Sequence, residues 1–227
     1  GVQTCALPIC TLTSASNEAH VDRLRDYVTS WHAMGFGDED VLWQSVGEIS
    51  SRINVARTLG GTFSPHCAAI QPWHLVRGLA RVLESRGVEI FEGSPVTAIE
   101  RSRVTTTGGE VRAKFVVRAI ESFASQMKPT KRSVVPLYSL MVSTEPLPED
   151  VWRSIGWSGR ETFADGRNMV TYAQRTADGR IAFGGRGAPY HFGSRIEDRF
   201  DRHDTIHRRL EETVREIFPQ VADADRK

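Results

Sequence analysis

The stretch Gly60–Glu100, GGTFSPHCAAIQPWHLVRGLARVLESRGVEIFEGSPVTAIE, decides the fold because strand, helix and strand patterns follow one another within it. After the Gly60-Gly61 turn, TFSPHCAAI is typical of a strand. Pro72 suits the first turn of a helix, and apolar residues then recur at helical spacing until Gly87, a favourable residue just beyond a helix end. VEIFEG follows as a short strand. This order is half of a βαβ unit and predicts an α/β fold.

Strand patterns dominate the sequence after this unit. The runs VTAIER, RVTTT and EVRAKFVVRAI read as strands, and the FVV core of the third indicates burial on both faces. A strong hairpin signal, Asp178-Gly179, lies further downstream. The strands predicted for an antiparallel sheet cover residues 134–145, 160–166, 168–175 and 180–187.

Helical periodicity marks three further segments. Residues 17–34 predict an amphipathic helix. A second helix is expected to begin near Asp38, a good N-cap, and to be followed by a strand over residues 52–59. Residues 194–218 predict a long charged helix. The apolar residues expected to face inward from the second and third helices are Val41, Leu42, Val46, Ile49, Phe200, Ile206, Leu210, Val214 and Ile217.

The first ten residues, GVQTCALPIC, are unusual because they carry no charge and no methionine. A secretory signal would need a basic leader, a longer apolar run and a small-residue cleavage site. The first nine residues instead resemble the translation of a common sequencing adapter. We therefore expect Gly1–Ile9 to be an artefact, and the chain to be a fragment of a longer gene whose reading frame was entered before Cys10.

Composition excludes several classes of protein. The 227 residues carry a net charge of +1, which gives no electrostatic reason to expect nucleic acid or an anionic membrane as partner. No apolar run approaches the roughly 18 residues of a membrane span. Outside the first nine residues only Cys10 and Cys67 remain, and their isolation argues against a zinc site and a disulfide framework. We expect a cytoplasmic location and no metal.

Motifs for other chemistry are incomplete. The glycine clusters at Gly35 and Gly184 lack the three glycines, placed between strand and helix, that cradle a diphosphate. His203 and His207 share a helical face but have no third metal ligand. His66 and Cys67 are adjacent on a predicted strand, so their side chains should point to opposite faces, which disfavours a thiol nucleophile. No GxSxG sequence indicates a hydrolase.

The ordered string from Gly60 to Glu100, followed by GGEVRAKFVVRA, resembles the middle of the D-amino-acid-oxidase-like (DAO) family of FAD-dependent oxidoreductases. VVPLYSLMVSTEPLP and YAQRTADGRIAFGGRG extend this resemblance. It implies a partial Rossmann-like FAD-binding domain and a mixed or antiparallel-sheet substrate domain. The implied divisions are 1–10, the adapter-derived segment; 11–64, leading into the substrate domain; 65–125, the partial FAD-binding domain; and 126–227, the substrate-domain sheet and long helix.

The resemblance also implies roles for individual residues. Val96 matches the residue whose backbone meets the adenine end of FAD, and Ala119 a small residue beside the cofactor; both could equally fill a sheet. Tyr172 and Arg175 are similar to a substrate-side strand whose arginine pairs with the substrate carboxylate, as a planar guanidinium does well. His66 is a third substrate-side candidate. A solvated arginine and a structural imidazole are the alternatives.

The implied reaction is oxidation of the C–N bond of an amino acid or other amine, by hydride transfer to FAD. Dioxygen or another acceptor would then reoxidise the flavin, whose ring carries the difficult chemistry. The family's diphosphate-binding GxGxxG unit and its closing glycine-rich segment are absent, so we expect the isolated chain to be inactive. The alternatives are an FAD-dependent monooxygenase-type flavoprotein and a non-catalytic scaffold.

Overall fold

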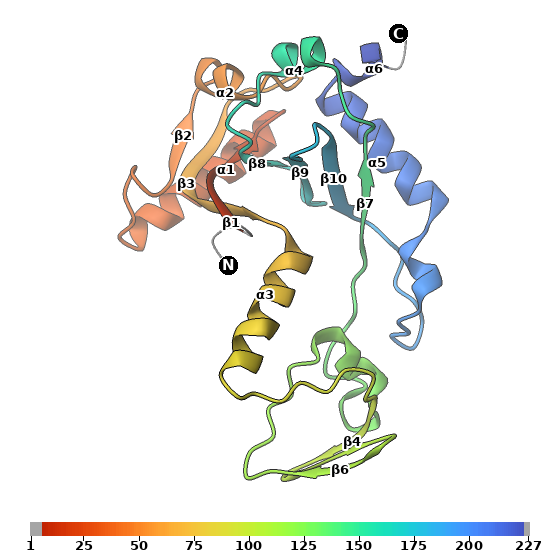
Figure 1. The fold of residues 1–227 in the computed structure, drawn as a ribbon. Helices are drawn as coiled ribbons and strands as arrows, with labels where there is room; N and C mark the ends of the chain where they lie inside the picture. Colours follow the sequence, from red (N-terminus) through yellow and green to blue (C-terminus); the bar gives the residue numbers. More distant parts are fainter. Residues whose placement is uncertain (1–5, 225–227) are drawn as a thin grey trace. The chain divides into compact units, whose positions relative to one another are not determined.

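The computed structural model describes residues 6–224 and shows an α/β chain in two compact units (Figure 1). Unit 1 contains the described residues up to Pro72, then Ser139–Ala188 and the described residues from Arg202 onward. Unit 2 contains Trp73–Tyr138 and Pro189–Asp201. The chain therefore leaves unit 1 and returns to it twice.

Unit 1 is built on a seven-stranded mixed sheet with strand order β2-β3-β1-β8-β9-β10-β7. Neighbouring strands are antiparallel except for β1 and β8, which run parallel. The mixed sheet that the sequence predicts is thus confirmed. Its elements are β1 Ala6–Ser14, α1 Glu18–Ala33, β2 Leu42–Gln44, α2 Val46–Arg52, β3 Gly61–Ile70, β7 Ser139–Ser143, α4 Glu149–Ile155, β8 Thr162–Asp165, β9 Thr171–Arg175, β10 Ile181–Arg186, α5 Asp204–Ile217 and α6 Val221–Ala224.

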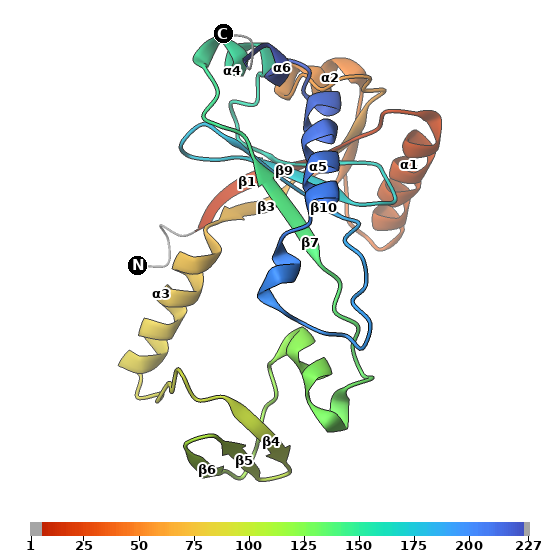
Figure 2. The ribbon, with the colours of Figure 1, turned by 90° about the vertical axis from the view of Figure 1, so that its right-hand side faces the viewer.

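The core of unit 1 lies between the sheet and α5, which crosses one face of the strands (Figure 2). Strand residues alternate between the two faces, so every second one points into this core. Leu12, Phe163, Ala173 and Phe183 follow one another across the paired strands, and all are buried. The buried residues of α5 that complete the core are Ile206, Leu210, Val214 and Ile217.

An aromatic cluster closes one end of this core. The indole of Trp157 stacks on the ring of Phe218 with centroids 5.3 Å apart, and Phe163 meets Phe218 edge-on at 5.5 Å. All three side chains are fully buried or nearly so. Burying one such ring stabilises the fold by about 2–3 kcal/mol, before the gain from its aromatic contacts.

The first two helices begin at well-defined caps. Asn17 accepts the backbone N–H of His20 at the start of α1, confirming the helix expected over residues 17–34. The helix expected from Asp38 is wrong: Leu42–Gln44 forms strand β2, and the next helix starts after Ser45. Ser45 and Glu48 form a reciprocal capping box, which fixes that start more strongly than Asp38 does.

Two other expectations in unit 1 need correction. The strand expected over residues 52–59 is not formed, apart from a single bridge between Ile53 and Gly156. Arg57 there has a φ of 57°, which no strand residue adopts. The long helix expected over residues 194–218 is divided into a 3₁₀ turn at Asp198–Asp201 and α5.

Residues Ala6–Ile9, which the sequence led us to exclude from the fold, belong to β1. They pair with Cys67–Ile70 of β3. Ladder hydrogen bonds come from the backbone, so an uncharged extended segment can pair with a free strand edge whatever its origin.

Unit 2 contains less regular structure. Its three-stranded antiparallel sheet has the order β4-β5-β6, and short 3₁₀ turns follow it. The strand expected at VEIFEG is absent, and the strand expected over residues 110–120 is limited to its first residues. A strand forms only where a neighbour accepts and donates its backbone hydrogen bonds, and no described residues do so there. The elements are α3 Pro72–Ser85, β4 Val96–Glu100, β5 Arg103–Thr106 and β6 Gly109–Arg112.

Helix α3 confirms the helix expected after Pro72, but its apolar side is uncovered. None of its residues is buried: Val76 is 64% exposed and Leu79 is 48% exposed. Phe115 and Val117, further along unit 2, are exposed as well. An apolar surface of this extent is unfavourable in water and promotes association.

Replacing Phe163 with alanine tests the aromatic cluster. We expect Phe163→Ala to lower the free energy of unfolding by about 3–5 kcal/mol, because the ring leaves a cavity among residues that cannot close it. Urea denaturation followed by tryptophan fluorescence measures the change. Phe192, which is 89% exposed, gives the matched control: Phe192→Ala should change stability by less than about 0.5 kcal/mol. Equal effects of the two variants would contradict this description of the core.

Candidate functional site

The sheet of unit 1 has a second face that is open across strands β7–β10. Burial alternates along these strands, and the residues pointing away from α5 are half-buried or exposed, except for the buried Gly184. Met141, Thr162 and Tyr172 point to this side, and Met141 is 52% exposed. We call this surface the open face. It offers hydroxyl groups and a thioether without a charged side chain at its centre.

Tyr172 is the most defined polar group on the open face. Its hydroxyl lies 3.0 Å from Oγ of Ser139, and its ring covers Gly184 on the neighbouring strand. A Cβ atom on Gly184 would come within 2.4 Å of the ring. The Tyr172 ring can therefore take this position only because residue 184 is a glycine. This contact gives a structural reason for a glycine in a cluster that lacks the phosphate-binding pattern.

Arg175 does not share this face with Tyr172. The two residues are three apart on β9, so their side chains point to opposite sides of the sheet. The Arg175 guanidinium lies 4.1 Å from the ring centroid of Trp152, and it donates to the carbonyl of Trp157 at 3.3 Å. These contacts hold it on the helix-covered face, so the structure does not bring together the pair expected from the sequence.

His66 lies on β3, beside a β-bulge that separates the pairs Ile9–Cys67 and Thr11–Ser64. Its Nε2 is 2.8 Å from Oδ1 of Asp40, and its side chain is 65% exposed. Sequence reasoning missed Asp40, because 26 residues separate the two partners and no local pattern joins them. The neighbouring Cys67 thiol lies 3.4 Å from the hydroxyl of Thr162.

The two residues expected at the cofactor lie in unit 2. Val96 begins β4, an outer strand that pairs only with β5 among the described residues. Ala119 is exposed and follows β6 in a segment without regular structure. Nearby, Glu121 adopts a φ of 46°.

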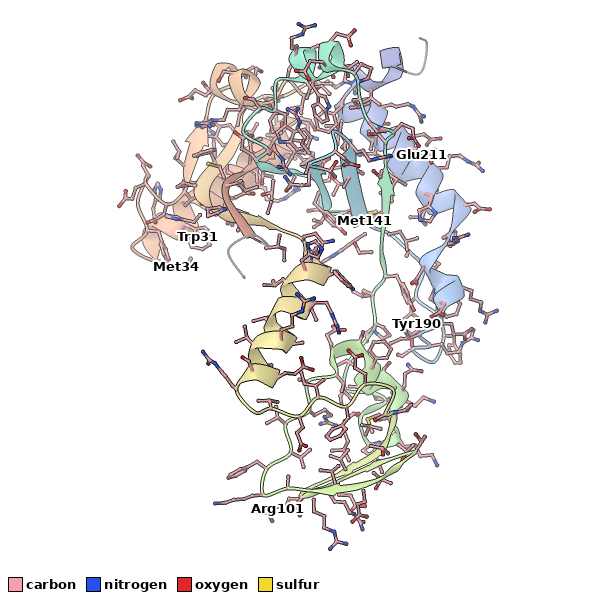
Figure 3. The ribbon with its side chains drawn as sticks, viewed as in Figure 1. Trp31, Met34, Arg101, Met141, Tyr190 and Glu211 are labelled. Atoms are coloured by element: carbon pink, nitrogen blue, oxygen red, sulfur yellow. The ribbon has the colours of Figure 1, made fainter. Side chains whose placement is uncertain are left out.

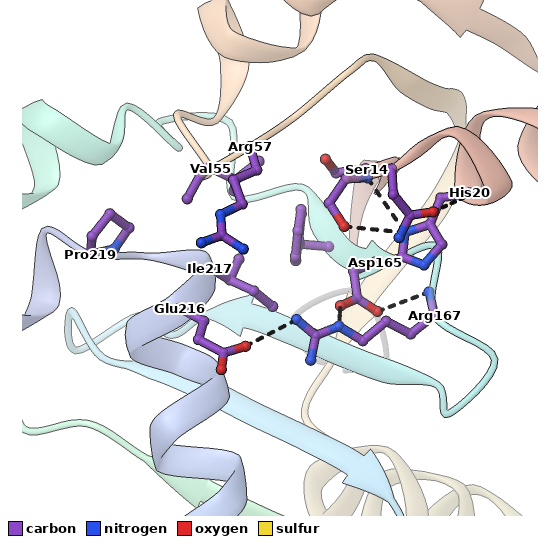
Figure 4. Close-up of a pocket in the computed structure, with 13 residues that line it drawn as sticks. Ser14, His20, Val55, Arg57, Asp165, Arg167, Glu216, Ile217 and Pro219 are labelled. Atoms are coloured by element: carbon purple, nitrogen blue, oxygen red, sulfur yellow. Dashed lines mark hydrogen bonds and ion pairs between the residues drawn. The ribbon is translucent and has the colours of Figure 1, made fainter.

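A polar cavity of about 780 Å³ lies at another part of unit 1 (Figure 4). Arg167 joins two carboxylates beside it: its Nε lies 2.7 Å from Asp165, and its Nη2 lies 3.3 Å from Glu216. Strand β8, the loop after it and helix α5 are thereby connected. The exposed Arg57 also lines the cavity. No sequence spacing predicted this network, because its members come from distant segments.

His20 borders the same cavity. Burial lowers the pKa of His20 below its ordinary value of 6.5, and the nearby Asp165 carboxylate opposes this only in part. The backbone N–H of Ser16 donates to Nδ1 at 3.4 Å, and the Ser16 hydroxyl lies 3.2 Å from the same atom. These contacts fit a neutral imidazole that accepts at Nδ1.

No cluster of metal ligands is found among residues 6–224, and no helix within that range has the length and apolar character needed to cross a bilayer.

Comparison with known proteins gives a consistent result. The family profile described as FAD dependent oxidoreductase (DAO) matches residues 2–227. A probable oxidoreductase OrdL from Rhizobium meliloti is 28% identical over 211 residues, which cover 88% of this chain and 46% of the relative. The chain thus spans about half the length of the curated relatives it matches.

Two solved structures show the same fold. Glycine oxidase from Geobacillus kaustophilus matches with a TM-score of 0.70 and 20% identity, covering 96% of this chain and 56% of the oxidase. L-alpha-glycerophosphate oxidase from Mycoplasma pneumoniae, whose structure contains FAD, matches with a TM-score of 0.68 and 15% identity. That match covers 95% of this chain and 58% of the other.

The lowered pKa of His20 predicts a pH-dependent stability. The unfolded chain binds a proton at this residue more readily than the folded chain does, so stability is retained above about 6.5 and decreases as the pH falls towards the folded value. We expect His20→Gln to reduce the loss of stability between neutral and mildly acidic pH. Urea unfolding at several pH values measures this. The control His207→Gln, on α5, should keep the wild-type slope; an unchanged slope in His20→Gln would contradict the assignment.

Proposed function

Because the chain belongs to the DAO family of FAD-dependent oxidoreductases, we propose that it contributes to oxidation of the C–N bond of an amino acid or another amine. The observation that carries this proposal is the open face, where Tyr172 presents an oriented hydroxyl on a surface without a charged side chain at its centre. An amine substrate needs a polar group for orientation and an apolar surface that excludes water. This face supplies both.

We propose that two residues of unit 2 contact one end of the cofactor. An outer strand leaves backbone N–H and C=O groups unpaired on one edge, so β4 at Val96 can offer hydrogen bonds to the adenine end of FAD. Ala119 has a small exposed side chain that permits close approach. The sequence has no strand, GxGxxG and helix to hold the diphosphate. We propose that Val96 and Ala119 are contact residues and that other parts of the parent protein hold the diphosphate.

The bound FAD would supply the hydride acceptor of the reaction. In this proposal, Tyr172 orients the substrate through its hydroxyl, which Ser139 fixes at 3.0 Å. The α-carbon of the substrate loses a hydride and its nitrogen loses a proton, giving an imine that water hydrolyses to a carbonyl compound and ammonia or an amine. Arg175 is left out, since its guanidinium lies against Trp152.

His66 has a different place in the proposal. Its imidazole lies beside the bulge of β3, hydrogen-bonded to Asp40, and it is accessible to solvent. We propose that it borders the substrate region and helps to set the position of Asp40. A direct role in proton transfer has no supporting contact.

The complete reading frame tests the reaction class. We expect anaerobic addition of a suitable amino acid or amine to bleach the flavin absorbance, without a nicotinamide cofactor. Tyr172→Phe should lower kcat/KM about five- to tenfold, because it loses one hydrogen bond of about 1 kcal/mol. Tyr138→Phe, which removes a hydroxyl bonded to the backbone of Glu197, is the matched control. Reduction by NADPH but by no amine would instead support a monooxygenase-type flavoprotein.

The 227-residue chain allows a separate test. Without a diphosphate-binding unit we expect it to bind FAD more weakly than micromolar and to show no oxidase activity. Titration of FAD fluorescence with purified chain measures this affinity. A yellow purified chain that retains stoichiometric FAD through gel filtration would contradict the expectation.

A further inference from the structure

A second cavity in unit 1, of about 570 Å³, lies between α1, the loop that follows it and strands β1 and β3. Three aromatic side chains from α1 and the loop after it line this cavity, in addition to Phe63 of β3. The ring centroids of Tyr27 and Trp31 are 5.9 Å apart, and those of Trp31 and Phe36 are 4.7 Å apart. Tyr27 and Phe36 are 46% and 42% exposed, so this row is no part of the buried core. Figure 3 labels Trp31 and Met34 near the end of α1.

The loop after α1 holds an acid at the same cavity. Asp40 receives two hydrogen bonds: the N–H of Gly37 donates to Oδ2 at 3.1 Å, and Nε2 of His66 lies 2.8 Å from Oδ1. The loop backbone closes on itself as well, since Asp40 and Val41 both donate to the carbonyl of Gly37. The carboxylate is thereby fixed beside the aromatic row. Its side chain is 29% exposed and remains accessible.

Among the described residues, the lining of the cavity contains no lysine and no arginine, and its strand wall presents hydroxyl groups and apolar side chains. Within that same described lining, Asp40 is the one carboxylate and His66 the one basic group. The lining residues from the strands are Thr11, Thr13, Thr62, Phe63, Ser64 and His66.

This set of groups matches one ligand chemistry. Aromatic faces attract a cation through the ring quadrupole, and rings around an organic ammonium group bind it more strongly when water is excluded. A carboxylate beside them adds charge attraction and disfavours anions. The polar cavity next to His20 differs, because the guanidinium groups of Arg57 and Arg167 line it together with the carboxylates of Asp165 and Glu216. The combination of an aromatic row and one carboxylate is thus a feature of the cavity beside α1 and not of the polar cavity.

We propose that the cavity is a binding site for an organic ammonium group, held between the row Tyr27, Trp31 and Phe36 and the carboxylate of Asp40. The hydroxyl groups of β1 and β3 would accept the rest of a small polar ligand. The site needs only unit 1 and no flavin. Because His66 and Asp40 also border the proposed substrate region, this proposal rests in part on the proposed function; binding at unit 1 can be measured without flavin, so the failure of either proposal is distinguishable from the failure of the other.

The test is a ligand-observed NMR titration of the 227-residue chain with choline, and with its neutral isostere 3,3-dimethylbutan-1-ol. We expect saturable binding of choline, and at least about fivefold weaker binding of the neutral compound. Asp40→Asn should weaken choline binding at least about fivefold, and Trp31→Leu should weaken it to a similar extent. Circular dichroism shows that each variant is folded.

Two matched variants show whether the effect belongs to the cavity. Asp38→Asn removes an acid two residues from Asp40 whose side chain is 82% exposed, and Trp73→Leu removes an exposed indole from α3. Both should bind choline as the wild type does, because water and salt screen an exposed charge. Should Asp40→Asn disturb the loop, Phe36→Leu tests the ring wall without changing the acid. Equal affinity for choline and its neutral isostere, absence of saturation, or equal losses in Asp38→Asn and Asp40→Asn would overturn the proposal.

Discussion

The parallel pairing of β1 with β8 is the constraint on which unit 1 depends. It joins Thr11–Ser14 to a strand about 150 positions later in the chain, and Leu12 lies beside Phe163 as a result. On its other side β1 pairs with β3, so it receives hydrogen bonds at both edges. The backbone N–H of Gly166 adds a bond to Ser14 beyond the ladder. Without β1 the sheet would divide into β2-β3 and β8-β9-β10-β7, each with an uncovered edge.

The two faces of that sheet then determine which side chains can have a function. Since α5 covers one face, residues pointing to it are committed to packing, and Arg175 is among them. Tyr172, three residues earlier, points to the other face and keeps an accessible hydroxyl. Because side chains alternate between the two faces of a strand, Tyr172 and Arg175 point to opposite faces, although the motif resemblance treats them as a pair. A family pattern gives positions along a strand, whereas function depends on the side to which each position points.

Helices α1 and α3 could be predicted from sequence because the spacing of their apolar residues and the residues at their ends, Asn17 and Pro72, carry the signal locally. The runs VEIFEG and FVV could not be placed correctly, since a strand depends on neighbours that may lie anywhere in the chain. Strand β2 was missed for a related reason: its three residues are held by β3 and not by their own periodicity. The residues of the candidate site also differ in whether their signal is local or depends on distant parts of the chain. Tyr172 could be found by resemblance, whereas the Asp40–His66 contact and the Arg167 ion pairs exist only through the fold.

Helix α1 borders the polar cavity and the aromatic cavity of unit 1 and keeps them apart. His20 on its first turns lines the polar cavity, whereas Trp31, eleven residues later, lines the aromatic one. At 1.5 Å per residue these positions are roughly 16 Å apart along the helix. Between them Leu24 and Val28 are buried, which anchors the helix to the sheet. The two cavities share no lining residue, and their charged groups differ, with arginines and carboxylates in one and the carboxylate of Asp40 in the other. A substitution in the lining of one cavity can therefore alter which ligands that cavity prefers, while α1 preserves the shape of the other cavity.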